Sequence, residues 1–158
     1  MTARVNLFGS EIAGKAMKGI NTASLAVINS GLLPKATIDL VLLRASQVNG
    51  CGFCTDIHSK DLAHAGESAT RVNLVAVWRE ATVFTEAERA ALELAEQGTR
   101  IADGAGGVPD EVWTNASKHY DEEQLAALTC LIALINASNR LGVIAGIPGG
   151  NYTPGQHG

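Results

Sequence analysis

The chain has 158 residues, of which 46% are hydrophobic, and a formal net charge of −4 at pH 7. This length suits one domain with a buried core, and the acidic balance supplies no basic face for nucleic acid or anionic lipid. The first ten residues lack the apolar run of a signal peptide, and no apolar stretch reaches the roughly 20 uninterrupted residues of a membrane span. Three cysteines are too few for a secreted disulfide scaffold, so we expect a protein of the reducing cytoplasm.

Apolar periodicity and turn residues predict an all-α protein with no alternating strand. The expected helices, in chain order, cover residues 11–29, 34–48, the cysteine pair to about 65, 69–79, 85–101, 109–118 and 122–143. Thr85 and Asp121 each begin a capping sequence, with Glu88 and Gln124 at the third helical position. The glycine-rich segment 103–107 lacks the preceding strand and the lysine of a phosphate-binding loop, so we interpret it as a connector.

The helices over 34–49 and 122–143 are apolar on most of their circumference. One small domain offers too little cover for such helices, so their composition predicts a homo-oligomer. Residues 1–147 are expected to form the single domain. The Gly- and Pro-rich segment 148–158 is expected to be a flexible tail.

The most informative residues are Cys51 and Cys54, which are separated by two residues, and His58, which follows Cys54 by four. On a helix, positions i and i+4 share a face, so the imidazole of His58 can accept the proton of the Cys54 thiol. A thiolate attacks electrophiles, and a neighbouring base is one way to form it. Cys51 lies close enough in sequence to close a disulfide. The segment therefore has the nucleophile, the base and the resolving sulfur of a redox thiol enzyme.

The sequence gives less support to other roles for the cysteines. A structural zinc site needs four ligands, and Cys51, Cys54 and His58 supply three, so no metal is expected. A buried structural pair would leave the position of His58 unexplained. Thioredoxin-like proteins share the spacing, but they place it after a strand in a βαβ unit, which this sequence lacks.

Several further residues receive structural interpretations. Cys130 lies among leucines and is expected to be a small buried hydrophobe. Trp78 and Phe84 fit a pocket wall and a core position equally well. The remaining histidines are expected at the surface or in packing: His64, His119 and His157. The polar residues of the last helix are expected to satisfy each other, nearby backbone or a partner subunit: Asn136, Asn139 and Arg140.

The segment from Asp39 to His58, which ends in the sequence NGCGFCTDIH, resembles the signature of the AhpD-like alkylhydroperoxidases of the carboxymuconolactone decarboxylase superfamily. The resemblance continues through 78–80, 84–89 and 133–141, and covers about residues 31–143. It implies an AhpD-like helical bundle, assembly as trimers or hexamers, and thiol-dependent reduction of hydroperoxides.

By the same resemblance, Cys54 attacks the peroxide, Cys51 resolves the product and His58 serves the proton relay. The family places a glutamate twelve residues before the first cysteine, where this chain has Asp39. Aspartate is one methylene shorter, so a bridging water is expected. No nicotinamide or flavin motif is present, so we expect no bound cofactor and an external dithiol electron donor protein, for which a lipoyl-type group is one possibility.

Two alternatives come from other classes. The decarboxylase branch acts on a lactone ring and does not need the cysteine pair, so Cys51 and Cys54 argue against such a lyase. A non-catalytic redox sensor or chaperone-like oligomer would keep the disulfide switch and show no turnover.

Overall fold

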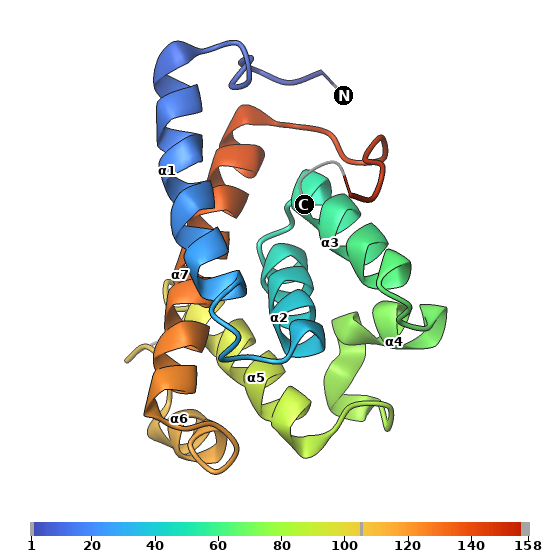
Figure 1. Ribbon diagram of the computed structural model, residues 1–158, viewed down its shortest axis with the longest axis vertical. Helices are drawn as coiled ribbons and strands as arrows, with labels where there is room; N and C mark the ends of the chain where they lie inside the picture. The colour runs from blue at the N-terminus through green and yellow to red at the C-terminus, as the bar shows by residue number, and fades with distance from the viewer. Residues whose placement is uncertain (1, 105, 156–158) are drawn as a thin grey trace.

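The computed structural model describes residues 2–104 and 106–155, and within them the chain is helical throughout (Figure 1). This confirms the all-α prediction. The elements are α1 (Glu11–Ile28), α2 (Lys35–Val48), α3 (Gly52–His64), α4 (Ala69–Leu74), the 3-10 helix η1 (Val75–Glu80), α5 (Glu86–Thr99), α6 (Asp110–Ala116) and α7 (Glu122–Ala145). The predicted helix over 69–79 is divided into α4 and η1, and Val77 has non-helical angles inside η1.

The helix ends follow the sequence signals. Thr85 and Asp121 form complete capping boxes with Glu88 and Gln124, as predicted. α7 ends at Gly146, which adopts the left-handed conformation with φ 66° that residues with a Cβ disfavour. These local signals place the helix boundaries within one or two residues of the sequence expectation for α1 and α7.

α2 is the central helix of the fold (Figure 1). It contacts α3, α5, α7 and η1, and nine of its residues are buried. One group of apolar residues packs α2 with α5, α6 and α7, and a second packs it with α3, η1 and α5. α2 is therefore buried on several sides, as its uniform apolar pattern predicts. Trp78 and Phe84 belong to the second group and are core residues.

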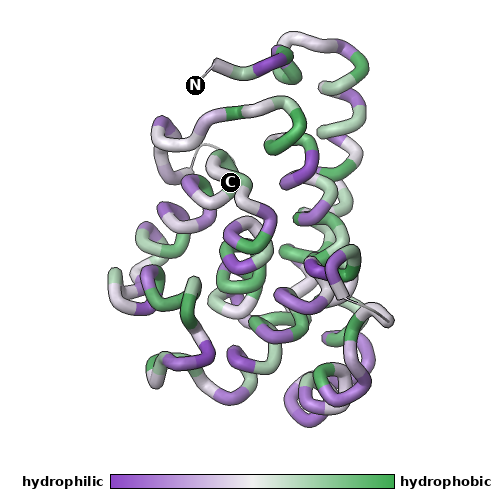
Figure 2. The backbone as a smooth tube through the Cα atoms, turned by 180° about the vertical axis from the view of Figure 1, so that it is seen from behind, coloured by the Kyte–Doolittle hydropathy of each residue, from purple (hydrophilic) through white to green (hydrophobic). Residues whose placement is uncertain are grey.

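α1 lies along α7 on one side of the molecule (Figure 1), yet none of its residues is buried. Hydrophobic and hydrophilic residues alternate along the helices (Figure 2), the pattern of helices that have one face on a neighbour. α1 therefore covers the other helices without entering the core.

Among the described residues, α7 is the one helix long and apolar enough to cross a membrane by length and composition. In this fold 44% of its most apolar 18-residue window is buried, and its inner face supplies Leu128, Leu131 and Ile132 to the core. The prediction for Cys130 is wrong: its side chain is exposed, because it lies on the face of α7 that points away from this core.

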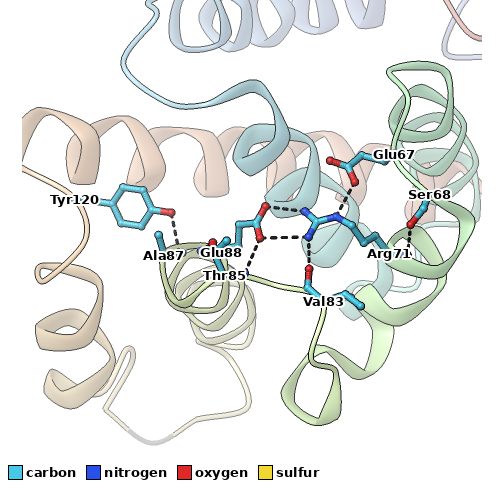
Figure 3. Close-up of polar contacts among 8 residues, drawn as sticks. All are labelled: Glu67, Ser68, Arg71, Val83, Thr85, Ala87, Glu88 and Tyr120. Atoms are coloured by element: carbon cyan, nitrogen blue, oxygen red, sulfur yellow. Dashed lines mark hydrogen bonds and ion pairs between the residues drawn. The ribbon is translucent and has the colours of Figure 1, made fainter.

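Polar networks tie the helices together. Arg71 of α4 pairs with Glu67 at 2.6 Å and with Glu88 of α5 at 2.7 Å, and it also donates to the Val83 carbonyl (Figure 3). Figure 3 also shows the Tyr120 hydroxyl donating to the Ala87 carbonyl. These contacts hold α4 and the turn after α6 against α5.

The polar residues of α7 bond one another, as predicted, and they also bond the end of α2, which the sequence did not predict. Asn49 donates to Asn136 and Asn139, at 3.0 and 2.9 Å. Asn139 in turn donates to Ser46, and Arg140 donates to Asn136. This network lies just before the cysteine turn and fixes the end of α2 against α7.

Beyond α7 the chain turns back across α3 (Figure 1). The sequence indicates a flexible tail here, but the described part makes defined contacts: Asp56 accepts from the backbone N–H groups of Gly150 and Tyr152, at 2.7 and 3.1 Å. Tyr152 is 9% exposed. Residues 156–158, with His157, lie outside the described residues.

Candidate active site

The cysteine pair lies at the turn between α2 and α3. Gly50 takes a left-handed conformation, φ 64°, which ends α2 and points the chain into α3. Cys51 is the N-cap of α3, and its Sγ accepts from the backbone N–H of Cys54 at 3.3 Å. The two Cα atoms are 5.4 Å apart and the sulfur atoms form a disulfide, within the Cα range usual for such bonds.

The two sulfurs differ in what they face. Cys54 lines a cavity of about 650 Å³ that is bounded by α1, α2, α3, α7 and the C-terminal segment. Cys51 does not line it and is 1% exposed, against 6% for Cys54. A molecule in the cavity therefore meets Cys54 first.

Gly142 of α7 packs directly against the disulfide. A Cβ atom at this position would lie 2.9 Å from the Sγ of Cys51 and 3.7 Å from that of Cys54. The first distance is shorter than van der Waals contact allows, so any larger residue here would compete with the sulfur for space. No local sequence signal marks Gly142, because a glycine inside a helix does not indicate which distant residue packs against it.

His58 also lines the cavity, one helical turn from Cys54. Its burial disfavours the charged imidazolium and lowers its pKa to about 4; the Lys35 charge acts in the same direction, while the Asp61 charge opposes it. His58 is therefore neutral at physiological pH. A neutral imidazole has an unprotonated nitrogen that can accept a thiol proton.

Asp39 lines the same cavity from α2. Burial raises its pKa, an ion pair with Lys35 opposes the rise, and the charges of Asp61 and Glu67 add to it. Its side chain is 8% exposed. Among the described contacts, Asp39 hydrogen-bonds Lys35, and no direct bond joins it to His58.

The four predicted residues thus fall in one place: Cys54, His58 and Asp39 line the cavity, and Cys51 is bonded to Cys54. Two charged side chains that the sequence did not single out also line the cavity: Lys35 and Asp61. A signal for Asp61 existed, since Cys54, His58 and Asp61 follow the i, i+4, i+7 pattern of one helix face. His64 is exposed, as expected, but it also borders the cavity, which the sequence analysis did not predict.

Across residues 2–104 and 106–155, no group of three or more His, Cys, Asp or Glu side chains is arranged to hold a metal ion. The absence of a metal from the working protein stays a prediction. The chemistry available from the described side chains is that of two thiols, a neutral imidazole and a carboxyl group of raised pKa.

Known proteins resemble this chain in sequence and in fold. The family model described as the carboxymuconolactone decarboxylase family matches residues 14–97. The uncharacterized protein YdfG of Bacillus subtilis is 36% identical over 146 residues, which is 92% of this chain and 96% of that protein. The alkyl hydroperoxide reductase AhpD of Methylocella silvestris is 39% identical over 67 residues, covering 40% of this chain and 38% of that one.

A solved structure shows the same architecture over nearly the whole chain. It is a protein of unknown function from Agrobacterium tumefaciens, assigned provisionally to antioxidant defence as an AhpD. It aligns with a TM-score of 0.87 at 35% identity, and the match covers 96% of this chain and 100% of that one. On the family match and these relatives, the chain is an AhpD-like member of the carboxymuconolactone decarboxylase family.

Proposed function

We propose that the protein is a thiol-dependent peroxidase that reduces hydroperoxides, with Cys54 as the attacking sulfur and Cys51 as the resolving sulfur. One observation supports the proposal most strongly: Cys54 and the neutral His58 line the same cavity, and Cys51, which does not line it, forms a disulfide with Cys54. Similarity to AhpD proteins supports the same chemistry.

The reaction follows from these groups. His58 accepts the proton of the Cys54 thiol, and the thiolate attacks the distal oxygen of the hydroperoxide. The O–O bond breaks, the proton returns to the departing alkoxide to give an alcohol, and Cys54 becomes a sulfenic acid. The Cys51 thiol then attacks this sulfur, the S–S bond forms and water leaves. An external dithiol reduces the disulfide and is itself oxidised.

The helix position of Cys51 suits its role as the resolving sulfur. As the N-cap of α3 it accepts the backbone N–H of Cys54, and the positive end of a helix favours a thiolate there. When an external thiolate attacks the cavity-facing Cys54, Cys51 is the group that departs. A thiolate that the helix end stabilises is also the better leaving group. Thus Cys51 acts best as a leaving group and Cys54 as the sulfur that meets both substrates.

Asp39 completes the proposed proton relay. Its raised pKa keeps it closer to exchanging a proton near neutral pH than an exposed aspartate. The shorter side chain and the missing direct bond to His58 favour transfer through a bridging water. The alternative role is electrostatic, since Asp39 also neutralises Lys35 in the first turns of α2.

The cavity walls indicate what the substrate is like. Most of the lining comes from apolar side chains, among them Phe8, Ile20, Leu42, Phe53 and Ile57. Such walls favour an organic hydroperoxide over hydrogen peroxide, because the apolar body gains from burial. We place the protein in the cytoplasm, without a bound cofactor, and served by a dithiol donor protein, for which a lipoyl-type group is one possibility.

The experiment measures peroxide consumption with a dithiol donor in wild type, Cys54→Ser, Cys51→Ser and, as a matched control, Cys130→Ser. We expect both active-site variants to lose turnover and Cys130→Ser to keep it. Brief peroxide treatment of Cys51→Ser should leave a trappable sulfenic acid on Cys54. A sulfenic acid on Cys51 in Cys54→Ser, with none in the reverse variant, would exchange the two roles.

The same assay separates the alternatives. A redox sensor would form the disulfide with peroxide yet show no turnover with any dithiol. A lactone decarboxylase would consume no peroxide with any dithiol, and in a separate lactone assay it would convert its substrate in the Cys51→Ser and Cys54→Ser variants as well as in wild type. Either outcome contradicts the peroxidase proposal.

A further inference from the structure

The segment after α7 is fastened to the outer side of α3. Asp56 accepts two backbone N–H groups of this segment through Oδ2 and pairs with Lys60 at 2.7 Å through Oδ1. Lys60 also donates to the carbonyls of Gly150 and Tyr152, at 3.2 and 2.9 Å. Burial raises the pKa of Asp56, but Lys60 and the two backbone donors outweigh it and hold the pKa below its usual value. The carboxylate is therefore charged where it holds the segment.

A close backbone contact adds to this attachment. A Cβ atom at Gly149 would lie 2.4 Å from the carbonyl oxygen of Gly52 and 3.2 Å from the Cβ of Asp56. Gly52 lies between Cys51 and Phe53, at the first turn of α3. Only glycine lets the chain approach this turn so closely.

The fastened segment also reaches the cavity. Tyr152 and Gly155 line it together with Cys54 and His58. The Tyr152 hydroxyl bonds Oδ1 of Asp61 at 2.9 Å, so the ring is fixed at both its backbone and its tip. A largely buried tyrosine held at both ends is a rigid wall.

We propose that residues 149–155, here called the strap, determine which molecules reach Cys54 by limiting their size. The inference rests on the proposed function only in assigning Cys54 as the reacting sulfur. With the strap seated, the opening beside Cys54 passes compact molecules faster than bulky ones. Displacing the strap from α3 enlarges the opening to Cys54, and the rate with a small reagent reports any change in the reactivity of Cys54 itself.

The test uses a Cys51→Ser, Cys130→Ser background, in which Cys54 is the only thiol. Its alkylation rate is measured with a small reagent, iodoacetamide, and a bulky one, N-(1-pyrenyl)maleimide. Gly149→Ala forces the strap away from Gly52, and Tyr152→Ala removes the wall itself. Gly14→Ala is the matched control, because nothing lies within 4 Å of a Cβ there.

We expect the ratio of the rate with the bulky reagent to the rate with the small reagent to rise about tenfold in both strap variants. A tenfold rise corresponds to lowering the free energy of a local opening by about 1.4 kcal/mol. In Gly14→Ala the ratio should stay unchanged. Circular dichroism checks that each variant keeps its helices. If Gly149→Ala does not fold, the rate ratio of Tyr152→Ala alone tests the proposal.

An unchanged ratio in a folded Tyr152→Ala variant overturns the strap proposal. Alkylation needs no peroxide, so this outcome is separate from the fate of the proposed function. A protein that shows the size effect but consumes no peroxide would contradict the peroxidase and leave the strap in place.

Discussion

At the scale of single residues, Gly142→Ala is the smallest substitution that places a new atom beside both sulfurs of the disulfide. In Gly142→Ala the added methyl overlaps the Sγ of Cys51. In the reduced state the Cys51 thiol can rotate away, whereas in the disulfide it is fixed, so the oxidised form bears the strain. Overpacking of this kind costs about 1–3 kcal/mol. We expect the disulfide to become easier to reduce, by about 30 mV for each 1.4 kcal/mol.

Titration of the Cys51–Cys54 pair against a dithiol buffer measures this shift, with Gly14→Ala as the control. An unchanged reduction potential in a folded Gly142→Ala protein would show that α7 moves aside at no cost, and that glycine is not required beside the disulfide.

His58 and Asp39 show how one physical cause acts on two groups in opposite directions. Burial lowers the pKa of the imidazole and raises that of the carboxyl, because in each case it disfavours the charged form. Lys35 acts with burial on His58 and against it on Asp39. The cavity thus contains a base that is neutral and an acid that protonates more readily than usual, which is the combination a proton relay needs.

At the scale of elements, Glu96 joins α2, η1 and α5. Its side chain is 6% exposed and accepts from Arg44 at 2.6 Å, from Arg79 at 2.8 Å and from the indole N–H of Trp78 at 3.1 Å. Burial raises the pKa of Glu96, but these donors outweigh it and bring the pKa down to about 2. The stabilisation by this carboxylate is therefore present above its unfolded pKa and is lost as the pH falls from 4.5 towards 2.

Glu96→Gln removes the charge while keeping the shape. Because it leaves Arg44 largely buried without its partner, we expect the free energy of unfolding to fall by about 3–5 kcal/mol. Urea denaturation at pH 7 measures it. Glu93→Gln is the matched control: this neighbouring glutamate pairs with Arg79 at 3.8 Å and is 29% exposed, so its loss should change the free energy of unfolding by less than about 1 kcal/mol. Equal effects in the two variants would contradict the central role of Glu96.

At the scale of the whole molecule, the isolated chain leaves large apolar side chains in contact with solvent. Ile12, Trp113, Val143 and Ile144 are 76%, 45%, 44% and 69% exposed, and α1 has no buried residue. Exposed apolar surface of this kind favours association. We propose a homo-oligomer, as a trimer or a hexamer, formed in part through the outer face of α7.

Multi-angle light scattering at micromolar concentration should therefore give three or six times the chain mass of 16.4 kDa. Ala133→Glu places a charge on the exposed outer face of α7 and should shift the protein towards the monomer, whereas Glu123→Gln on the same helix should not. A stable monomer of the wild-type chain would reject the oligomer.

Most helices and their ends could be predicted from the sequence, because these depend on neighbours a few residues away; the division of 69–79 into α4 and η1 could not. The capping residues Thr85 and Asp121, the stop at Gly66 and the apolar pattern of α2 are such local signals. The same holds for Cys51, Cys54 and His58, whose relation is set within one turn of one helix. Family resemblance added Asp39, which the structure places on the same cavity.

Contacts between segments that are distant in sequence became known from the three-dimensional fold. It brought Gly142 against Cys51 across about 90 residues of chain, exposed Cys130 on the outer face of α7, and attached residues 149–152 to α3 although their Gly- and Pro-rich composition indicates mobility. Such contacts depend on packing between elements, where the absence of a Cβ lets two segments approach closely or one carboxylate bonds a distant segment. The local sequence around a residue does not indicate which distant segment packs against it.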